Sequence, residues 1–247
     1  MTSDATQTER VARERERVRP LVARARVVLW DFDGPICRLF AGHKAHQVAE
    51  DLIEWLGAQG LRGLLTPEEQ RTADPHVVLH AVDRMHPRSD LVAALEERLT
   101  EAELTAAASA WPTPYADPLI RTLVATGVRL AIATNNSPRT ARAYLSGRNL
   151  EACFAPHVYG RTTNLALLKP HPYCLDRALT ATGATREATL MIGDTPSDLI
   201  AARRAGIGFL GYARDERKRK LLHEAGAGAG DVVTSLESVL QVARDRP

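Results

Sequence analysis

The chain has 247 residues, of which 45% are hydrophobic and 25% charged, so it can bury an apolar core and lacks the composition of a disordered polypeptide. Its formal net charge is +2, with both signs interspersed, which gives no reason to expect nucleic acid as a partner. No stretch approaches the roughly 18 apolar residues of a membrane span, and no leader pattern is visible, so we expect a cytoplasmic protein without a membrane partner.

The first predicted element is a charged arm over residues 1–25. Seven arginines lie between Arg10 and Arg26, and glutamates in the same stretch offset part of their charge. This pattern favours a solvated helix or a loose arm. We expect no targeting role for it, because a mitochondrial presequence avoids acidic residues.

The next element is a nearly continuous apolar run that starts near residue 26 and ends at Asp31, Asp33 and Gly34. Such a run is typical of a buried parallel strand that leads into a loop. Gly34, directly after the second aspartate, permits a sharp turn. Two carboxylates one residue apart are common, so this segment alone does not establish catalysis.

Residues 40–111 show helical patterns without intervening strands. Three helices are predicted, over residues 43–60, 75–86 and 90–111. A proline-rich stretch after residue 111 then returns the chain to strand and helix alternation. We therefore expect residues 40–111 to form a small helical cap inserted into a core made of residues 26–39 and 112–247.

Within the core, apolar runs alternate with helical patterns, which predicts an α/β fold with a Rossmann-like, doubly wound parallel sheet and helices on both faces. The later strands begin near Val128, Ala155, Ala188 and Gly206, and the helices begin near Asp117, Pro138, Pro172 and Asp198. A glycine-rich loop, a short strand and a closing helix are expected to follow. Ligands of such sheets bind beyond the carboxyl ends of the strands.

Polar residues gather at those predicted strand ends. Asp31 and Asp33 follow the first strand, Thr134 follows the second, and Asp194 and Asp198 follow a later one, while Lys169 lies in a loop between them. Taken singly, Asp194, Asp198 and Thr134 could equally cap helices, and Lys169 could be an ordinary surface residue. As an ordered set they predict a catalytic site.

This ordered set resembles the four motifs of the haloacid-dehalogenase-like superfamily, in the phosphoglycolate phosphatase and β-phosphoglucomutase-like branch whose helical cap follows the first motif. The resemblance covers nearly the whole chain beyond residue 26. It implies a magnesium-dependent phosphatase that hydrolyses a phosphorylated small metabolite through an aspartyl-phosphate intermediate. Such a phosphatase would act as a monomer or a homodimer.

The resemblance implies a role for each residue of the set. Asp31 would be the nucleophile, and Asp33 would be the general acid and then the general base. Thr134 and the backbone amide of Asn135 would bind phosphoryl oxygens, and Lys169 would neutralise charge. All of these roles depend on the residues meeting at one edge of the sheet.

The same resemblance implies a magnesium site. Asp31 and Asp194 would bind the ion through their carboxylates, and Asp33 would bind it through its main-chain carbonyl. Asp198 would act more remotely, either through a water ligand or by orienting Lys169. The ion and the lysine would offset the repulsion between an anionic nucleophile and a phosphate dianion.

The loop after Gly34 departs from the family pattern, because Arg38 and Leu39 replace the usual polar pair and Pro35 stiffens the turn. Arg38 and His43 cluster where the core meets the predicted cap. They could bind an acidic group of the substrate, or they could be solvated linker residues.

Two other functions compete with the phosphatase. A sugar phosphomutase shares the core and the position of the cap and differs in how the cap handles the released intermediate. A noncatalytic regulatory or binding protein could retain the fold, although loss of Asp31, Asp33 or Asp194 would be expected in such a protein and none is lost.

Overall fold

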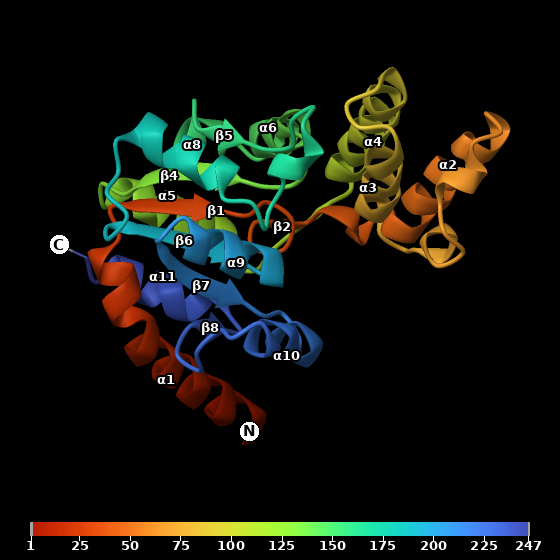
Figure 1. Cartoon of the computed structure of the whole chain (residues 1–247). Coiled ribbons are helices and arrows are strands. Elements are labelled where there is room, and N and C mark those ends of the chain that lie inside the picture. The colour runs from red at the N-terminus through yellow and green to blue at the C-terminus, as the bar shows by residue number, and fades with distance from the viewer. Residues whose placement is uncertain (1, 247) are drawn as a thin grey trace.

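The centre of the molecule is a six-stranded sheet, seen in a computed structural model that describes residues 2–246 (Figure 1). All neighbouring strands are parallel, in the order β5-β4-β1-β6-β7-β8. The strands are β1 (Val27–Trp30), β4 (Arg129–Ala133), β5 (Val158–Tyr159), β6 (Thr189–Gly193), β7 (Gly208–Tyr212) and β8 (Val232–Val233). The first strand in the sequence therefore lies between β4 and β6, so that the loops after these three strands are neighbours.

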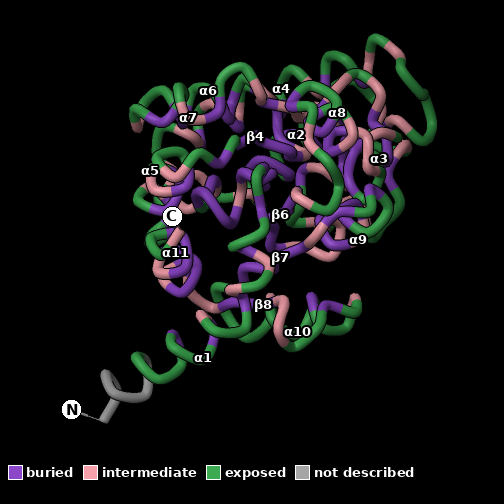
Figure 2. The backbone as a smooth tube through the Cα atoms, turned by 90° about the vertical axis from the view of Figure 1, so that its left-hand side faces the viewer, coloured by how far each residue is buried: buried purple, intermediate pink, exposed green. Residues whose placement is uncertain are grey.

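Helices cover both faces of this sheet because successive side chains of a strand point to opposite sides. Val28 and Trp30 of β1 pack with α1, α5, α6, α7 and α11, whereas Val27 and Leu29 pack with α8, α9 and α10. These helices are α1 (Thr2–Arg24), α5 (Ala116–Ala125), α6 (Pro138–Gly147), α7 (Glu151–Phe154), α8 (Tyr173–Thr182), α9 (Pro196–Arg204), α10 (Glu216–Glu224) and α11 (Leu236–Arg244). Figure 2 shows buried residues gathered around the sheet, while much of α1 is exposed.

Three further helices, α2 (Ala45–Ala58), α3 (Pro75–Met85) and α4 (Asp90–Ala108), lie beyond one end of the sheet (Figure 1). Their apolar faces meet in a separate cluster that includes Leu52, Leu79 and Leu95. The chain enters this region through β2 (Cys37–Arg38) and leaves it through β3 (Trp111–Pro112), and these two short strands pair antiparallel. Entry and exit are thus held side by side.

The charged N-terminal segment is a helix that packs on α11 (Figure 1). Val11, Val18 and Val22 are buried on its inner face. Glu14 is also buried, and its carboxylate accepts hydrogen bonds from the backbone and side chain of Thr234. Of the two expected forms, helix or loose arm, the structure has the helix, with one face covered by the core.

The predicted fold class is confirmed, since a parallel sheet carries helices on both faces. Two helices of the core, α7 and α10, were not predicted. Residues 216–224 form α10, a strongly charged helix whose Leu222 is its buried residue. A helix with one buried side chain has almost no apolar periodicity, and that periodicity is the main signal for a helix in a sequence. Within residues 2–246, no helix is both long enough and apolar enough to cross a membrane.

Candidate active site

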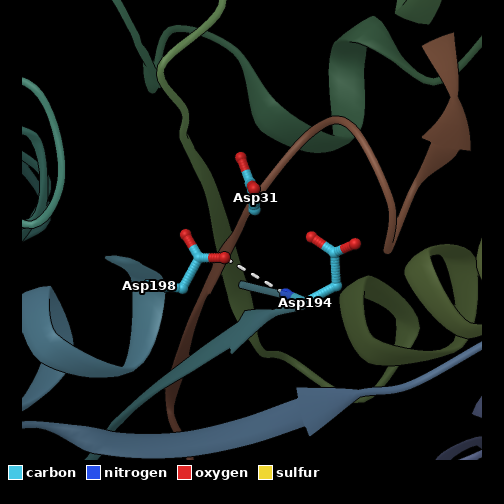
Figure 3. Close-up of side chains that lie close together, drawn as sticks. All are labelled: Asp31, Asp194 and Asp198. Carbon is cyan, nitrogen blue, oxygen red and sulfur yellow. Dashed lines mark hydrogen bonds between the residues drawn. The ribbon is translucent and has the colours of Figure 1, made fainter. Parts of the chain in front are cut away.

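The loops after β1, β4 and β6 bring the predicted site residues together. Asp31 follows β1, Thr134 follows β4, and Asp194 follows β6, with Asp198 in the first turn of α9. Figure 3 shows Asp31, Asp194 and Asp198 gathered from these neighbouring segments. Each offers an oxygen within 4.8 Å of the others, and we call these three residues the aspartate cluster.

Lys169 joins two members of the aspartate cluster. Its Nζ lies 2.9 Å from Oδ1 of Asp31 and 2.5 Å from Oδ1 of Asp198, and it donates a third hydrogen bond to the carbonyl of Ala133 at 2.8 Å. Burial raises the pKa of Asp31 to about 6, with a further contribution from Asp198, and Lys169 opposes this rise. The lysine itself stays charged, since the two carboxylates raise its pKa despite burial.

Oδ1 of Asp31 also accepts a hydrogen bond from the backbone N–H of Phe32 at 2.8 Å. Among residues 2–246, no group donates a hydrogen bond to the second oxygen, Oδ2. Asp31 lines a cavity of about 470 Å³ at this edge of the sheet. One oxygen is therefore fixed, and the other is available to a ligand.

Asp194 has a different cation partner. Its Oδ2 lies 2.6 Å from Nζ of Lys218, a residue of α10. Its Oδ1 is buried and has no hydrogen-bond partner among the described residues. Burial raises the pKa of Asp194 to about 7, and Lys218 limits the rise.

These features fit a bound divalent cation. A buried carboxylate oxygen without a partner costs free energy, and a hard cation is a suitable ligand for it. Oδ1 of Asp194 is such an oxygen, and Oδ2 of Asp31, which accepts no hydrogen bond from the described residues, offers a second ligand. Asp198 does not, since its Oδ1 binds Lys169 and its Oδ2 accepts from the backbone N–H groups of Asp194 and Thr195 and from the Thr195 hydroxyl.

Gly34 brings the first loop against Asp194. Its φ is +114°, and a Cβ atom placed there would lie 2.3 Å from Cγ of Asp194. Any other residue would therefore be strained and would also displace the carboxylate. The turn after Asp33 consequently passes directly beside the position suited to a cation.

Asp33 lines the same cavity, and its Oδ1 accepts a hydrogen bond from the backbone N–H of Leu39 at 2.9 Å. Burial raises the pKa of Asp33, while the Leu39 hydrogen bond and then the charges of Lys218, Arg214 and His76 oppose the rise. A carboxyl group with a raised pKa can hold a proton closer to neutral pH, which a general acid requires.

The loop after β4 is fixed by its own side chains. The Thr134 hydroxyl donates to Oδ1 of Asn136 at 3.1 Å, and it does not line the cavity. Asn135 does line it, and its side chain makes two hydrogen bonds with the backbone of Lys169, at 2.8 and 3.0 Å. The loop therefore positions the lysine that contacts Asp31.

A second buried charge cluster supports this loop, and sequence reasoning missed it. Glu103 of α4 accepts hydrogen bonds from the Asn136 side chain at 3.0 Å, the Ser137 backbone at 2.9 Å and Arg161 at 2.8 Å. Arg161 also donates to the carbonyl of Asn135. We call these contacts the Glu103–Arg161 network. A signal was present in the sequence, because Glu103 falls in register with Leu95 and Leu99 on the buried face of a helix.

Besides Thr134, two other predicted substrate-binding residues, Arg38 and His43, lie outside the cavity lining. Arg38 is exposed, and its guanidinium lies 5.3 Å from the centre of the Trp111 ring. His43 is half-buried in the short segment before α2 and does not line the cavity. Lys218 and Arg217 of α10 line it instead, together with Arg214 just before this helix, and none of the three was predicted as a site residue.

Curated proteins with similar sequences are named as phosphatases. A phosphoglycolate phosphatase from Rhodospirillum rubrum is 37% identical over 114 residues, which cover 44% of this chain and 46% of that protein. The pyrophosphatase PpaX from Halalkalibacterium halodurans is 33% identical over 96 residues, 38% of this chain and 44% of that protein. These matches span less than half the length of either relative.

Solved structures match over more of the chain and show the fold. A predicted phosphatase from Clostridium acetobutylicum has a TM-score of 0.65 at 16% identity and covers 88% of this chain and 97% of its own. The L-2-haloacid dehalogenase from Xanthobacter autotrophicus has a TM-score of 0.52 at 16% identity, with coverage of 90% and 100%. Both carry the parallel-sheet architecture described above.

A family model gives the broadest sequence match. The model described as haloacid dehalogenase-like hydrolase matches residues 25–206, a range that includes the aspartate cluster, Lys169 and the Glu103–Arg161 network. The chain belongs to the family of haloacid dehalogenase-like hydrolases.

Proposed function

We propose that this chain is a magnesium-dependent phosphatase that hydrolyses a phosphorylated small metabolite through an aspartyl-phosphate on Asp31. The observation that carries the proposal is the state of Asp31, whose Oδ1 is held by Lys169 and the Phe32 backbone while Oδ2 accepts no hydrogen bond from residues 2–246. The named phosphatases among the relatives support the same activity.

In the first half-reaction, Oδ2 of Asp31 attacks phosphorus in line with the leaving oxygen. A bond forms between Oδ2 and phosphorus as the bond to the leaving oxygen breaks. Asp33 transfers its proton to that oxygen, a role that its raised pKa suits. Lys169 stays charged and offsets the negative charge that gathers around Asp31.

In the second half-reaction, Asp33 has lost its proton and takes one from water. The water oxygen attacks phosphorus, the bond from phosphorus to Oδ2 breaks, and inorganic phosphate leaves. Asp33 is then protonated again, and Asp31 is again a free carboxylate. The two carboxyl groups therefore return to their starting states after each turnover.

Magnesium would be held by Asp31, Asp194 and the main chain at Asp33, and when bound it would neutralise charge on the carboxylates and the phosphoryl group. We assign Asp198 a positioning role, because Lys169 and the turn after β6 already use both of its oxygens. Asn135 has a similar role, since it fixes the backbone of Lys169.

We also propose that residues 40–111 form a cap over the site. The α3 residues His76 and His80 line the cavity opposite α10, and the three helices of this region have an apolar cluster of their own. A cap of this kind would exclude bulk water from the aspartyl-phosphate until the leaving group departs.

The test measures inorganic phosphate released from a panel of phosphometabolites, with magnesium and with chelator. We expect wild-type protein and Asp51→Asn, a substitution of an exposed aspartate on α2, to be equally active. Asp31→Asn should fold normally and lose turnover by roughly 10⁴-fold or more, the scale seen when a nucleophile is removed.

Three outcomes would contradict the proposal. Full activity of Asp31→Asn would show that Asp31 is not the nucleophile. Hexose phosphates that isomerise faster than they lose phosphate, with stimulation by a sugar bisphosphate, would show a phosphomutase. A wild-type protein that hydrolyses nothing and is not stabilised by fluoroberyllate with magnesium would be a noncatalytic member of the family.

A further inference from the structure

The turn after β1 receives a hydrogen bond from a residue that is distant in the sequence. Thr113 directly follows β3, where the chain returns from α4 to the core, and it is only 3% exposed. Its hydroxyl donates a hydrogen bond to the carbonyl of Gly34 at 2.6 Å. No other group within residues 2–246 donates to that carbonyl. Because Gly34 is buried, its carbonyl depends on Thr113 for a partner.

The backbone of Thr113 is held on both sides. Its N–H donates to the carbonyl of Ile36 at 3.0 Å, which continues the pairing of β2 with β3 by one residue. Its carbonyl accepts a hydrogen bond from the N–H of Ala116, the first residue of α5, at 3.1 Å. The hydroxyl of Thr113 therefore comes from a fixed position and not from a free linker.

Gly34 needs such a restraint, because glycine has more backbone freedom than any other residue. Its φ of +114° is one that other residues rarely adopt. On one side, the N–H of Gly34 donates to the carbonyl of Cys37 at 2.6 Å, and on the other side, the carbonyl of Gly34 accepts from Thr113. The peptide units before and after the Cα of Gly34 are thus each held by one hydrogen bond. Together, these two bonds fix both backbone dihedral angles of the glycine.

The peptide unit between Asp33 and Gly34 carries the main-chain oxygen that is proposed to bind magnesium. This peptide is trans, so its C=O points away from its N–H, and the bond from that N–H to Cys37 sets the direction of the oxygen. Rotation at the Cα of Gly34 would turn this peptide relative to the Asp194 carboxylate, which lies directly beside the glycine. The hydrogen bond from Thr113 opposes that rotation.

We propose that Thr113 is a positioning residue for the metal site. By fixing the turn at Gly34, it fixes the direction of the Asp33 main-chain oxygen. This inference rests on the metal site of the proposed phosphatase and adds a residue that contacts neither the ion nor the substrate, since Thr113 does not line the cavity. The side chain of Asp33 is held separately, by the N–H of Leu39, so Thr113 acts on the main chain of the turn and not on the general acid.

The test compares Thr113→Val with Thr182→Val. Valine has nearly the shape of threonine but lacks the hydroxyl. The control residue, Thr182 of α8, is also a buried threonine, and its hydroxyl donates to the backbone carbonyl of Ala178 at 2.7 Å. Both variants lose a buried hydrogen bond and should melt a few degrees below wild type. Only Thr113→Val should change the metal site.

The readout is the affinity for Mn²⁺, a paramagnetic probe of the magnesium site, measured from the electron paramagnetic resonance signal of the free ion. Loss of binding in Asp194→Asn assigns the bound ion to this site. We expect Thr113→Val to bind Mn²⁺ roughly 10- to 100-fold more weakly than wild type, the range for residues that orient metal ligands. Thr182→Val should bind as wild type does, and Thr113→Ser, which keeps the hydroxyl, should restore most of the affinity.

Wild-type affinity in Thr113→Val would overturn the inference, and so would an equal weakening in Thr182→Val, which would show a general loss of stability. If Thr113→Val fails to fold, Thr113→Ala and Thr113→Ser make the same comparison, because they differ by the hydroxyl alone. A wild-type protein that binds no Mn²⁺, or an Asp194→Asn variant that binds it unchanged, would also overturn the inference. If Thr113→Val weakens Mn²⁺ binding as expected but the wild type hydrolyses no phosphate ester, the positioning role stands and the phosphatase proposal fails.

Discussion

Two groups of buried charges lie on either side of the loop after β4, and they differ in how well their oxygens are satisfied. Glu103 is fully buried, and both of its carboxylate oxygens accept hydrogen bonds from neighbouring groups. Although burial alone would raise its pKa, Arg161 lowers it by charge and hydrogen bonding. In the aspartate cluster, burial prevails and the pKa values of Asp31 and Asp194 rise to about 6 and about 7.

The difference distinguishes a structural ion pair from a binding site. Arg161 matches Glu103 with fixed donors, so the network is complete without a ligand. The aspartate cluster has two lysines but leaves Oδ1 of Asp194 without a partner in the described residues. A buried carboxylate with an oxygen that lacks a hydrogen-bond partner is stabilised when it binds a cation or a proton.

The largest expected effect is on catalysis at the incomplete site. Asp33→Asn keeps the size of the side chain but removes the proton, so turnover should fall by roughly 10² to 10⁴-fold, the usual contribution of general acid–base catalysis. The loss should be smaller for aryl phosphates whose leaving groups need no proton. The measurement is turnover of esters with good and with poor leaving groups, with Asp51→Asn as the control. An equal loss for the two kinds of ester would show a purely structural role in place of acid catalysis.

The next effect is on stability at the complete network. Arg161→Met leaves Glu103 buried without its cation, which should cost roughly 3 to 5 kcal/mol of unfolding free energy, as expected when one partner of a buried pair is removed. The matched control is Arg139→Gln, which breaks the exposed pair with Glu97 and should cost about 0 to 1 kcal/mol. Urea unfolding measures the free energy of unfolding of both variants. Equal losses would mean that the buried network stabilises the protein no more than an exposed ion pair does.

The pH dependence of stability should have opposite signs in the two clusters. The pKa of Asp194 is raised from 3.8 to about 7, so its contribution to stability is complete below about pH 4 and is lost as pH rises to about 7. In chelator, Asp194→Asn should therefore gain stability relative to wild type over that window, by an amount on the order of a few kcal/mol.

The pKa of Glu103 is lowered from 4.5, so its contribution is present above that value and is lost as pH falls through the folded-state pKa. Glu103→Gln should be less stable than wild type at neutral pH, and the deficit should shrink in acid. Thermal melts from pH 3 to 8 compare the two variants. A parallel pH trend for both would contradict the distinction between the clusters. Magnesium should stabilise wild type more than Asp194→Asn.

The smallest expected effect concerns Asn135, which contacts both Lys169 and Arg161. Its carbonyl accepts from Arg161, and its side chain holds the backbone of Lys169. Asn135→Ala removes the two side-chain bonds only, so stability should fall by about 1 to 2 kcal/mol and turnover by roughly tenfold. Unchanged turnover with reduced stability would show that Lys169 needs no support from this loop.

Much of the aspartate cluster could be predicted because apolar runs specify strands and parallel strands place their carboxyl ends at one edge. Asp31 and Asp194 follow the two adjacent strands β1 and β6, and Thr134 follows β4 on the other side of β1. Their roles in catalysis stay predictions. Thr134 lies after β4 as expected, but its hydroxyl donates a hydrogen bond to Asn136. Such a local hydrogen bond cannot be predicted from a strand pattern.

The sequence by itself determined the alternation of strands and helices in the core apart from α7 and α10, the family, and the acidic residues at the strand ends, because each depends on local periodicity and on short motifs. Lys169 was expected from the family motifs, but the other cation partners of the buried acids were decided by tertiary structure alone. Lys218, which contacts Asp194, lies in α10, a helix without apolar periodicity. Arg161 contacts Glu103, which is 58 residues away in the sequence. Arg38, although adjacent to the first motif, stacks on Trp111 outside the cavity. Partners of a buried charge are fixed by how distant elements pack, and that information is not local.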